Sequence, residues 1–463
     1  MNLFESYKNR LAVCESIHQK SHMGAKMSNS KKLMIATVLN NTARFMNESL
    51  STGAATQAPA QANTAGAYNV LGDYKRFCLN ISTVALPNLI LPELMIVQPM
   101  TSITGYVTYV KFSAGVTKGG VEQGALLNGV WSHGEANEFR ANYTSNAVVE
   151  PVAADATECV LSWEPVEGSV FGIKADGSKE ALTPTGGKVT FTAGTYAKVA
   201  YFYNNINIPQ TGSAESRVPT LTAGLDGVSL HAKVRRIAIY YSQIAAFQAK
   251  TDFGMDLADQ LSAQAQGELA YEIDTEGVMM LNEGAELDES LKMPSYAANA
   301  AAATTYISRG QYYEVISEYV ARAKQIMFER TQKFAPNYMV VGSRVLTVLP
   351  YSKGWVAAPA STVNGPFFAG TLDGIKVFCS PAINKDRFFF GVNGDDLQTS
   401  AGIYAPYMAI VPTQLLGLPD GGMSQGFSTM YDMKLLSTYK KGDHEYSHLL
   451  VAGELVAAQD GAI

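Results

Sequence analysis

The stretch Ala85–Phe112 reads ALPNLILPELMIVQPMTSITGYVTYVKF and changes its pattern halfway along. Its first half is apolar but contains Pro87, Pro92 and Pro99, each of which lacks a backbone N–H and has a fixed φ. An uninterrupted helix and a central strand are therefore both excluded, and a packed, extended segment is expected. After residue 104 the residues alternate as in a strand. One face carries Tyr106, Thr108 and Val110, and the other carries Val107, Tyr109 and Lys111. On pattern alone, this is a buried segment that leads into a hairpin.

Length and composition indicate a globular protein of two or three compact units. The chain has 463 residues, of which 47% are apolar. Its 35 basic and 41 acidic residues give a net charge of −6, so any contact with nucleic acid would have to be local. The cysteines are isolated and lack CxxC spacing, which argues against a zinc ribbon, a dithiol site or a disulfide framework. We expect these four residues to be reduced and partly buried: Cys14, Cys78, Cys159 and Cys379.

No apolar run approaches the length that a membrane-spanning helix needs. The first residues lack the basic region and apolar core of a secretion signal. We therefore expect a protein that is made in the cytoplasm and does not bind a membrane.

Several motifs carry a resemblance to a known family. They are Leu86–Ile90 (LPNLI), Val97–Met100 (VQPM) and Thr104–Val107 (TGYV), followed by Asn337–Val345 (NYMVVGSRV), Phe368–Asp373 (FAGTLD) and Tyr404–Met408 (YAPYM). In this order and spacing they closely resemble the major capsid proteins of T-even-like tailed bacteriophages, which have the HK97-type fold. The resemblance covers most of the chain after residue 80. It leaves residues 1–67 and 158–232 unmatched, and none of its motifs is catalytic.

The resemblance implies an α+β HK97-type capsid fold with an inserted all-β domain. The implied boundaries are 1–67 for a basic N-terminal arm plus linker, 68–97 for the first part of the peripheral domain, 98–157 for the E-loop arm, 158–232 for the β-rich insertion domain, 233–283 for the peripheral domain with its spine helix, 284–425 for the axial domain, and 426–463 for the return to the peripheral domain.

The N-terminal region is basic on an acidic protein. Residues 1–50 are rich in helix formers and contain seven lysines and arginines against three glutamates. They predict either a solvated amphipathic helix pair or an arm that contacts an acidic neighbour, a scaffold or DNA. Ser51–Ala67 lacks large apolar and charged side chains, so it is expected to be a linker or an arm along a neighbouring subunit.

The chain beyond Phe112 is glycine-rich and returns through an expected strand at residues 139–149. Such a two-stranded arm is too thin to be stable alone, and by resemblance it is the E-loop that overlaps the adjacent subunit. His133 and Glu135 within it lack a third ligand and are interpreted as a solvated loop tip. Short β-rich runs between Cys159 and Ala232 then predict a small sandwich or barrel, which by resemblance projects from the shell.

Two amphipathic helices are expected in the second half. The first covers Met255–Leu281, where Glu268, Glu272 and Glu276 repeat every four residues. Like charges at this spacing destabilise a helix, so they form either a solvated face or a contact with basic residues of an adjacent subunit. The second covers residues 312–327. Strands are expected at 338–341, at 365–380 with Asp373-Gly374 as a turn, and at 387–392, which together with this helix predict an α+β unit.

One motif points to chemistry. His444–His448 reads HEYSH, and H-E-x-x-H on a helix holds zinc in metallopeptidases. Here the motif follows a turn and continues with strand alternation. Residues four apart in a strand are separated by about 13 Å, too far for both imidazoles to bind one metal ion. A zinc peptidase is therefore the minor alternative.

The sequence predicts a non-enzymatic major capsid protein that assembles into hexamers and pentamers, forming an icosahedral or elongated shell around double-stranded DNA. An encapsulin-like nanocompartment shell is the alternative within the same fold. The expected partners are further copies of the chain, scaffold, portal and decoration proteins, and packaged DNA bound non-specifically; no catalytic residue, metal or cofactor is expected. The expected location is the virion, after synthesis in the host cytoplasm. The residues predicted to define fold and assembly are Pro87, Gln98, Pro99, Gly105, Glu268, Glu272, Tyr404, Pro406 and Tyr407.

Overall fold

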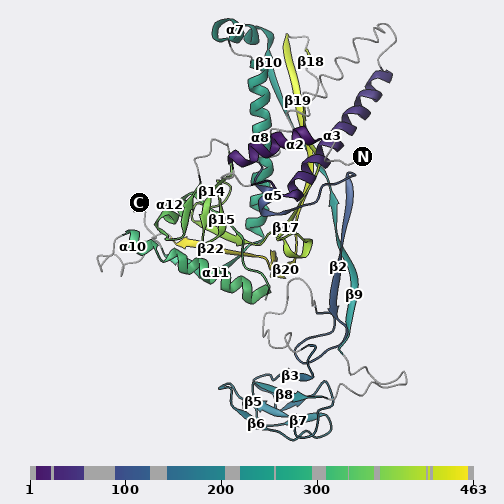
Figure 1. Ribbon diagram of the computed structural model, residues 1–463, viewed down its shortest axis with the longest axis vertical. Helices are drawn as coiled ribbons and strands as arrows, with labels where there is room; N and C mark the ends of the chain where they lie inside the picture. The colour runs from purple at the N-terminus through teal and green to yellow at the C-terminus, as the bar shows by residue number, and fades with distance from the viewer. Residues whose placement is uncertain are drawn as a thin grey trace. The chain divides into compact units, whose positions relative to one another are not determined.

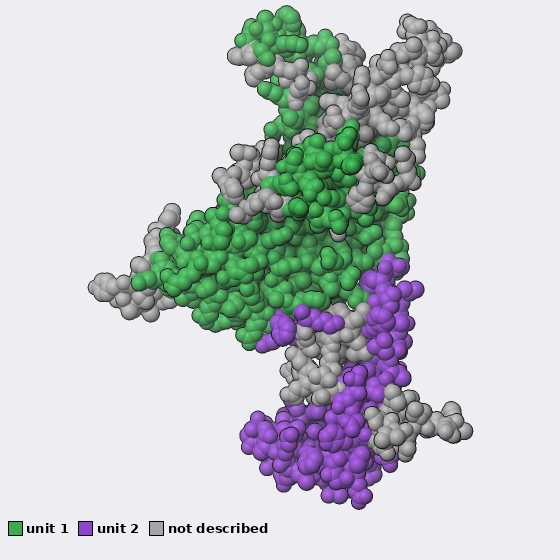
Figure 2. Space-filling model, viewed as in Figure 1, with its two compact units in different colours: residues 1–107, 228–327, 334–463 green, residues 108–227, 328–333 purple. Residues whose placement is uncertain are grey.

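The computed structural model describes residues 7–21, 26–56, 89–125, 143–203, 219–254, 257–294, 309–331, 333–358, 365–412, 416–417 and 421–456. The chain divides into two compact units (Figure 2). Unit 1 contains residues 1–107, 228–327 and 334–463, and unit 2 contains residues 108–227 and 328–333. Pro87, His133 and Glu135 lie outside the described residues.

The helices of the described residues are shown in Figure 1. They are α2 (Lys8–Ser21), α3 (Asn29–Thr56), α5 (Leu91–Leu94), α7 (Gln243–Phe253), α8 (Leu257–Glu283), α10 (Arg309–Tyr313), α11 (Ile316–Thr331) and α12 (Ser343–Val348), with 3-10 turns η2 (Leu349–Tyr351) and η3 (Leu397–Thr399). The two predicted amphipathic helices are thus confirmed as α8 and α11. Helix α3 continues through Ser51–Thr56 of the expected linker or arm, whose residues 57–67 lie outside the described residues, so that expectation stays a prediction.

A seven-stranded mixed sheet forms one core of unit 1. Its order is β11 (Glu286–Pro294), β22 (Leu450–Val456), β16 (Arg387–Gly391), β12 (Tyr338–Val341), β15 (Ile375–Cys379), β14 (Phe367–Leu372) and β13 (Trp355–Ala357). Every residue of β12 is buried, as expected for a central strand without alternation. The predicted turn between β14 and β15 is confirmed at Asp373 and Gly374, which both have positive φ.

A second sheet of unit 1 has the order β1 (Ile96–Val97), β17 (Gly402–Pro412), β19 (Gly422–Leu435) and β10 (Lys233–Ser242), with β18 (Leu416–Gly417) beside β19. Helix α8 runs along β10 and β19 (Figure 1). Its predicted apolar stripe is buried there at Ala265, Leu269 and Ile273. The hairpin β20 (Thr438–Lys441) and β21 (His444–Ser447) forms a separate two-stranded sheet.

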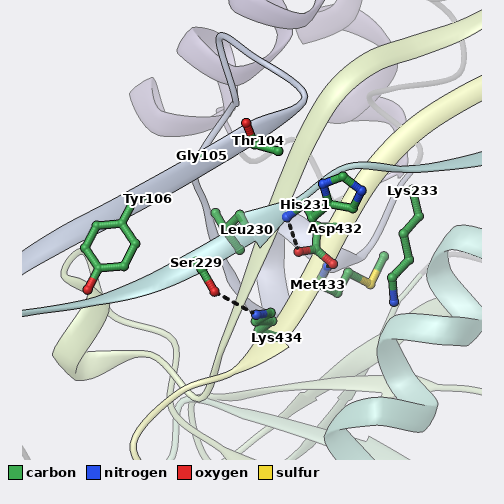
Figure 3. A pocket seen from close by; sticks show the side chains of 10 residues that line it. All are labelled: Thr104, Gly105, Tyr106, Ser229, Leu230, His231, Lys233, Asp432, Met433 and Lys434. Carbon is green, nitrogen blue, oxygen red and sulfur yellow. Dashed lines mark hydrogen bonds between the residues drawn. The ribbon is translucent and has the colours of Figure 1, made fainter.

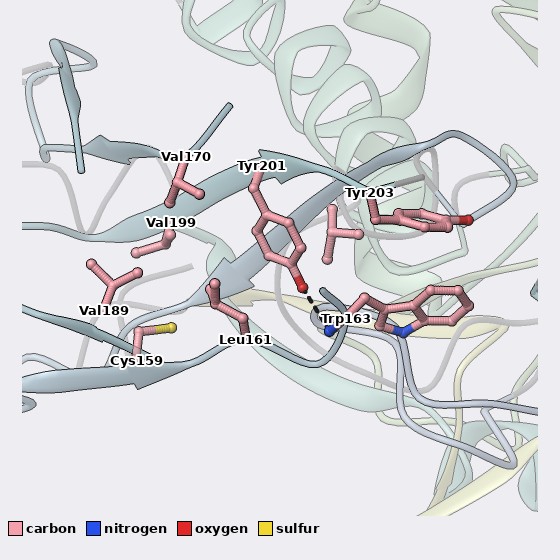
Figure 4. Packing of buried hydrophobic residues seen from close by; sticks show 9 residues of the cluster. Cys159, Leu161, Trp163, Val170, Val189, Val199, Tyr201 and Tyr203 are labelled. Atoms are coloured by element: carbon pink, nitrogen blue, oxygen red, sulfur yellow. Dashed lines mark hydrogen bonds between the residues drawn. The ribbon is translucent and has the colours of Figure 1, made fainter. Parts of the chain in front are cut away.

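Unit 2 contains a small all-β body. A four-stranded sheet has the order β3 (Ala147–Pro151), β8 (Lys198–Phe202), β5 (Phe171–Ile173) and β6 (Lys179–Ala181), and β4 (Glu158–Val160) pairs with β7 (Lys188–Thr190). Their inner side chains form one core around Trp163 and Tyr201, whose hydroxyl accepts a hydrogen bond from the backbone N–H of Trp163 (Figure 4). The predicted short strands are therefore present.

The expected return strand of the two-stranded arm is wrong. Strand β2 (Thr104–Ala114) pairs with β9 (Leu221–His231), not with the described part of that range, residues 143–149. Within that range, β3 instead begins at Ala147 and pairs with β8 of the all-β body. The all-β body therefore lies within the chain excursion that leaves by β2 and returns by β9. The names and limits of the peripheral, axial and E-loop regions stay predictions.

The close approach of the backbone at Gly342, which precedes α12, gives a test of this fold. A Cβ atom there would overlap the carbonyl oxygen of Asn384 and lie 2.6 Å from that of Lys385. We expect Gly342→Ala to lower the free energy of unfolding of the unassembled subunit by about 1–3 kcal/mol, measured by urea unfolding. The matched control is Gly267→Ala in α8, where a Cβ meets nothing within 4 Å. This control should raise stability by roughly 0.5–1 kcal/mol, and equal effects of both changes would contradict the described backbone packing.

Candidate assembly surface

The predicted residues Gln98, Pro99, Tyr404 and Pro406 come together where β1 runs parallel to β17. The backbone N–H of Gln98 donates to the carbonyl of Tyr404 at 3.0 Å, and that of Met100 donates to Pro406 at 3.0 Å. Pro99 lies between these two donors. In a parallel pair only every second residue of a strand donates to a given neighbouring strand, so a residue at this position needs no backbone N–H for pairing with β17. The proline therefore stiffens the segment without loss of a hydrogen bond to β17.

Tyr404, Pro406 and Tyr407 make contacts within the chain. Tyr404 is buried, its ring lies 6.0 Å from that of Tyr431, and burial raises the pKa of its hydroxyl well above the usual value. A register shift in the pairing of β17 with β19 follows Pro406. The carbonyl of Tyr407 accepts a hydrogen bond from Asn41 of α3 at 3.0 Å. These residues thus support the sheet and the docking of α3.

Gly105 lies at an open hollow of about 750 Å³ (Figure 3). Strands β2, β9, β10 and β19 line it with Thr104, Gly105, Tyr106, Ser229, Leu230, His231, Lys233, Asp432, Met433 and Lys434. The Asp432 carboxylate accepts the backbone N–H of His231 at 2.8 Å, which fixes β9 to β19 at this point. A Cβ on Gly105 would meet only the Met100 methyl, at 3.4 Å, so the fold itself leaves room for a small side chain there.

The strands β2 and β9, together with Ile103 just before β2, carry exposed apolar side chains. Their exposed fractions are 46% for Ile103, 64% for Tyr106, 46% for Val110, 59% for Leu221 and 80% for Leu225. Apolar residues gathered on so thin a ribbon are typical of a surface that another protein covers.

The three glutamates of α8 do not behave alike. Glu268 and Glu272 are exposed. Glu276 instead binds Arg235 of β10 at 2.5 Å and accepts a hydrogen bond from the Tyr431 hydroxyl at 2.6 Å. A hydrogen bond from the Arg235 guanidinium to the Tyr431 hydroxyl, and then the contact with Glu276, raise the pKa of Arg235 above its usual value. The prediction of a solvated face or intersubunit contact is thus wrong for Glu276, while Glu268 and Glu272 remain available to a partner.

Sequence reasoning missed the polar contacts that hold α3. The Asn41 amide donates to the carbonyl of Met100 at 2.6 Å as well as to Tyr407, and the Thr42 hydroxyl accepts the N–H of Ala409 at 3.2 Å. Met34, Ile35, Val38 and Leu39 of the same helix are fully buried. The apolar spacing of this helix could have indicated a buried face, but not which strand covers it.

The H-E-x-x-H motif lies on β21 and the residue that follows it, as predicted from the strand alternation. His444 pairs with Lys441 of β20, and the His448 ring stacks on Tyr439 with 4.3 Å between ring centres. Among the residues that the structure describes, no group of three or more His, Cys, Asp and Glu side chains could hold a metal ion.

In the same part of the chain, no helix is long and apolar enough to span a membrane. The cysteines at positions 14, 159 and 379 are buried and are not joined in disulfide bonds.

The sequence was compared with known families. The model of a family described as "Major capsid protein Gp23" matches residues 72–456, which is well over half of the chain. The chain belongs to this family. It forms the capsid shell of a tailed phage from multiple copies, and the family match favours this function over the encapsulin-like alternative. The location that follows is the capsid of the virion.

The sequences of two curated relatives agree with this assignment. The major capsid protein of Enterobacteria phage T4 is 24% identical over 383 residues, which cover 75% of this chain and 72% of the relative. That of Vibrio phage KVP40 is 21% identical over 420 residues, which cover 81% and 78%. A structure from Mycobacterium phage Che8 has a TM-score of 0.35 and 14% identity, covering 53% of this chain and 76% of that one. The capsid of Myoviridae Phage XM1 also gives 0.35, with 9% identity and coverage of 54% and 82%. Both structural likenesses are weak and carry no argument. The predicted HK97-type α+β fold class is supported by family membership instead.

The strand context of the H-E-x-x-H motif predicts that the protein does not hold zinc there. Purified protein should contain far less than one zinc ion per chain by elemental analysis, before and after His448→Ala, because a strand separates the two imidazoles by about 13 Å. Stoichiometric zinc that is lost in this variant would contradict the assignment.

Proposed function

We propose that copies of this chain assemble into hexamers and pentamers through the ribbon formed by β2 and β9. The observation that carries this proposal is the row of exposed apolar side chains from Ile103 to Val110 and on β9. A single subunit leaves this surface in water. Burial against a neighbour would release about 25 cal/mol for each Å² of apolar surface covered, repeated at every contact of a closed shell.

We also propose that the N-terminal helices contribute a basic surface to the assembly. Lys8 and Lys26 are exposed, and Lys32 is partly exposed in an ion pair with Glu15 at 3.0 Å. Such residues suit packaged double-stranded DNA or an acidic scaffold, since phosphate and carboxylate pairing needs no sequence recognition. Portal and decoration proteins would be further partners, synthesis would occur in the host cytoplasm, and the protein would have no catalytic role.

The assembly proposal is tested by sedimentation and negative-stain microscopy of the purified protein. Closed shells, or rings of five and six subunits, would support it. A stable monomer that does not assemble, alone or with the products of neighbouring genes, would contradict it. Nucleic-acid content of the shells separates a genome container from an empty compartment.

Gly105→Val should block assembly more than it unfolds the subunit. A Cβ there meets only the flexible Met100 side chain, so we expect the free energy of unfolding to change by less than about 1 kcal/mol. The added methyl groups would occupy the hollow at the base of β2 and β9, and particle yield should fall at least tenfold by sedimentation. The control is Thr104→Val, which keeps the side-chain shape at the adjacent exposed position. Normal particles from Gly105→Val would count against a role for this hollow.

Glu272→Lys tests whether basic residues of a neighbour lie along α8. The expected result is slower assembly and a weaker dependence of assembly on salt, because reversal of an exposed charge turns attraction into repulsion. Glu272→Gln, which only removes the charge, should have an intermediate effect. Unchanged assembly and salt dependence in both variants would show that α8 presents a merely solvated face.

A further inference from the structure

Helix α7, which follows β10 in unit 1 (Figure 1), exposes an uncharged row of side chains to water. The exposed fraction is 72% for Ile244 and 72% for Phe247. Successive residues of a helix are about 100° apart, so Gln248 and Thr251 lie on the same side as these two, and both are exposed. We name these four residues the α7 face.

The α7 face points away from the rest of unit 1. The other side of the helix contains Ala246 and Ala249, which are partly buried. The two charged residues of the helix, Lys250 and Asp252, lie roughly a quarter turn or more from the centre of the α7 face. An exposed helix face normally carries charged side chains, so this face is suited to burial against another surface.

Helix α7 is held in one conformation at both ends. The Ser242 hydroxyl caps its first turn and accepts the backbone N–H of Ala245 at 3.2 Å. Gly254 ends the helix in the left-handed region, with a φ of 65°, and its N–H returns to two carbonyls of the last turn. The N–H of Gln243 also donates to the carbonyl of Gly421, just before β19, at 3.1 Å. Because the helix is already ordered, little conformational entropy is lost when another surface covers it.

The area of the α7 face indicates what covers it. Two separate proteins that form a stable complex each bury about 800 Å². A buried aromatic side chain accounts for roughly 150–250 Å², so a face with two large apolar side chains provides at most about half of that area. Its partner must therefore be held by other contacts as well. Further copies of this chain in the capsid shell meet this condition, and each offers the same uncharged face.

We propose that α7 is a contact between copies of the chain: the α7 face of one subunit packs against the α7 face of another across a two-fold axis, and this pair joins different rings of the shell. Phe247 and Ile244 of the two copies form the apolar centre of the contact. Lys250 and Asp252 stay at its edge, in water. No cofactor or accessory protein is needed for this pairing.

Symmetry places the two copies in different rings. A contact that uses the same surface on both subunits has a two-fold axis, whereas the contacts that close a ring join two different surfaces. A ring of five subunits has no two-fold axis. An α7 pair that its members form must therefore reach a subunit of another ring.

The α7 contact is separate from the ribbon formed by β2 and β9. The ten residues of β10 lie between the end of β9 and the start of α7, and ten residues of strand span about 33 Å. The step from a paired helix to joined rings rests on the proposed assembly of rings through the ribbon. The pairing of two α7 faces does not depend on it.

Cross-linking tests the pairing directly. Particles are assembled from full-length Gln248→Cys, alone or with the products of neighbouring genes, and treated with a bismaleimide that has a two-carbon spacer. We expect covalent dimers, and peptide mapping should join position 248 of one chain to position 248 of another. The control is Lys250→Cys, which lies on the same helix away from the α7 face and should give at least tenfold less of its own dimer. Unassembled Gln248→Cys subunits should also stay unlinked, because the face alone is too small to hold a dimer.

Assembly of Phe247→Ser and of Ile244→Ser tests the role of the contact. Rings should still form, but the yield of closed shells should fall at least tenfold by sedimentation and negative-stain microscopy. The urea midpoint of the subunit should not change, because both side chains are largely exposed. Lys250→Ser is the matched control, which places the same residue on the same helix and should form shells as the natural chain does.

Three results would overturn the inference. They are the absence of a 248-to-248 linkage in particles, linkage of position 248 to a different part of the chain or to another protein, and a normal yield of closed shells from both serine variants. Loss of rings in these variants would also contradict it, since α7 would then act within a ring. Failure of the ribbon proposal looks different: rings and shells would persist when β2 and β9 are altered, while the linkage at position 248 would still report the α7 pair.

Discussion

The parallel contact between β1 and β17 is the constraint on which the rest of unit 1 depends. Two backbone hydrogen bonds, from Gln98 and Met100 to Tyr404 and Pro406, join segments that are far apart in the sequence. Pro99 restricts the conformations of the first segment before it folds, which reduces the entropy lost when it pairs. Asp274 fixes the turn just before β1, and Asn41 of α3 binds both segments just after it. The spine helix, the N-terminal helices and the second sheet all meet at this contact.

Local sequence patterns predicted those elements whose type and buried face are evident from their own residues. The stripe from Leu261 to Ile273 has helical spacing, and the structure packs Leu261, Ala265 and Leu269 against β10 and β19. Strand β12 has the residues predicted for it, since a short run of Tyr, Met and Val after a proline can bury both faces in a central position. The turn at Asp373 and Gly374 could also be predicted, because Asp-Gly is a common pair in turns whose two central residues have positive φ, as both have here.

Pairings across long distances could not be read in this way. The partner of β2 was expected at residues 139–149 because that run is the next strand-like one, yet β9 occupies the position after the whole all-β body. Alternation states which face is apolar but not which strand lies beside it. The burial of Lys31 could not be read from the sequence for a related reason: Lys31 resembles its partly exposed neighbour Lys32, and only tertiary packing distinguishes the two.

Residues that support the fold and residues that we propose for assembly have different physical roles. Tyr404 and Pro406 are buried within the subunit, so changes there act through the stability of every copy, whether or not it has neighbours. Tyr106 and Leu225 are largely exposed, so changes there act only when a neighbour covers them. A shell subunit needs both kinds, because a thin ribbon gains little stability alone and must be held at its base by a rigid body. Gly105 lies at that base, where the sheet that fixes the fold meets the strands that leave it.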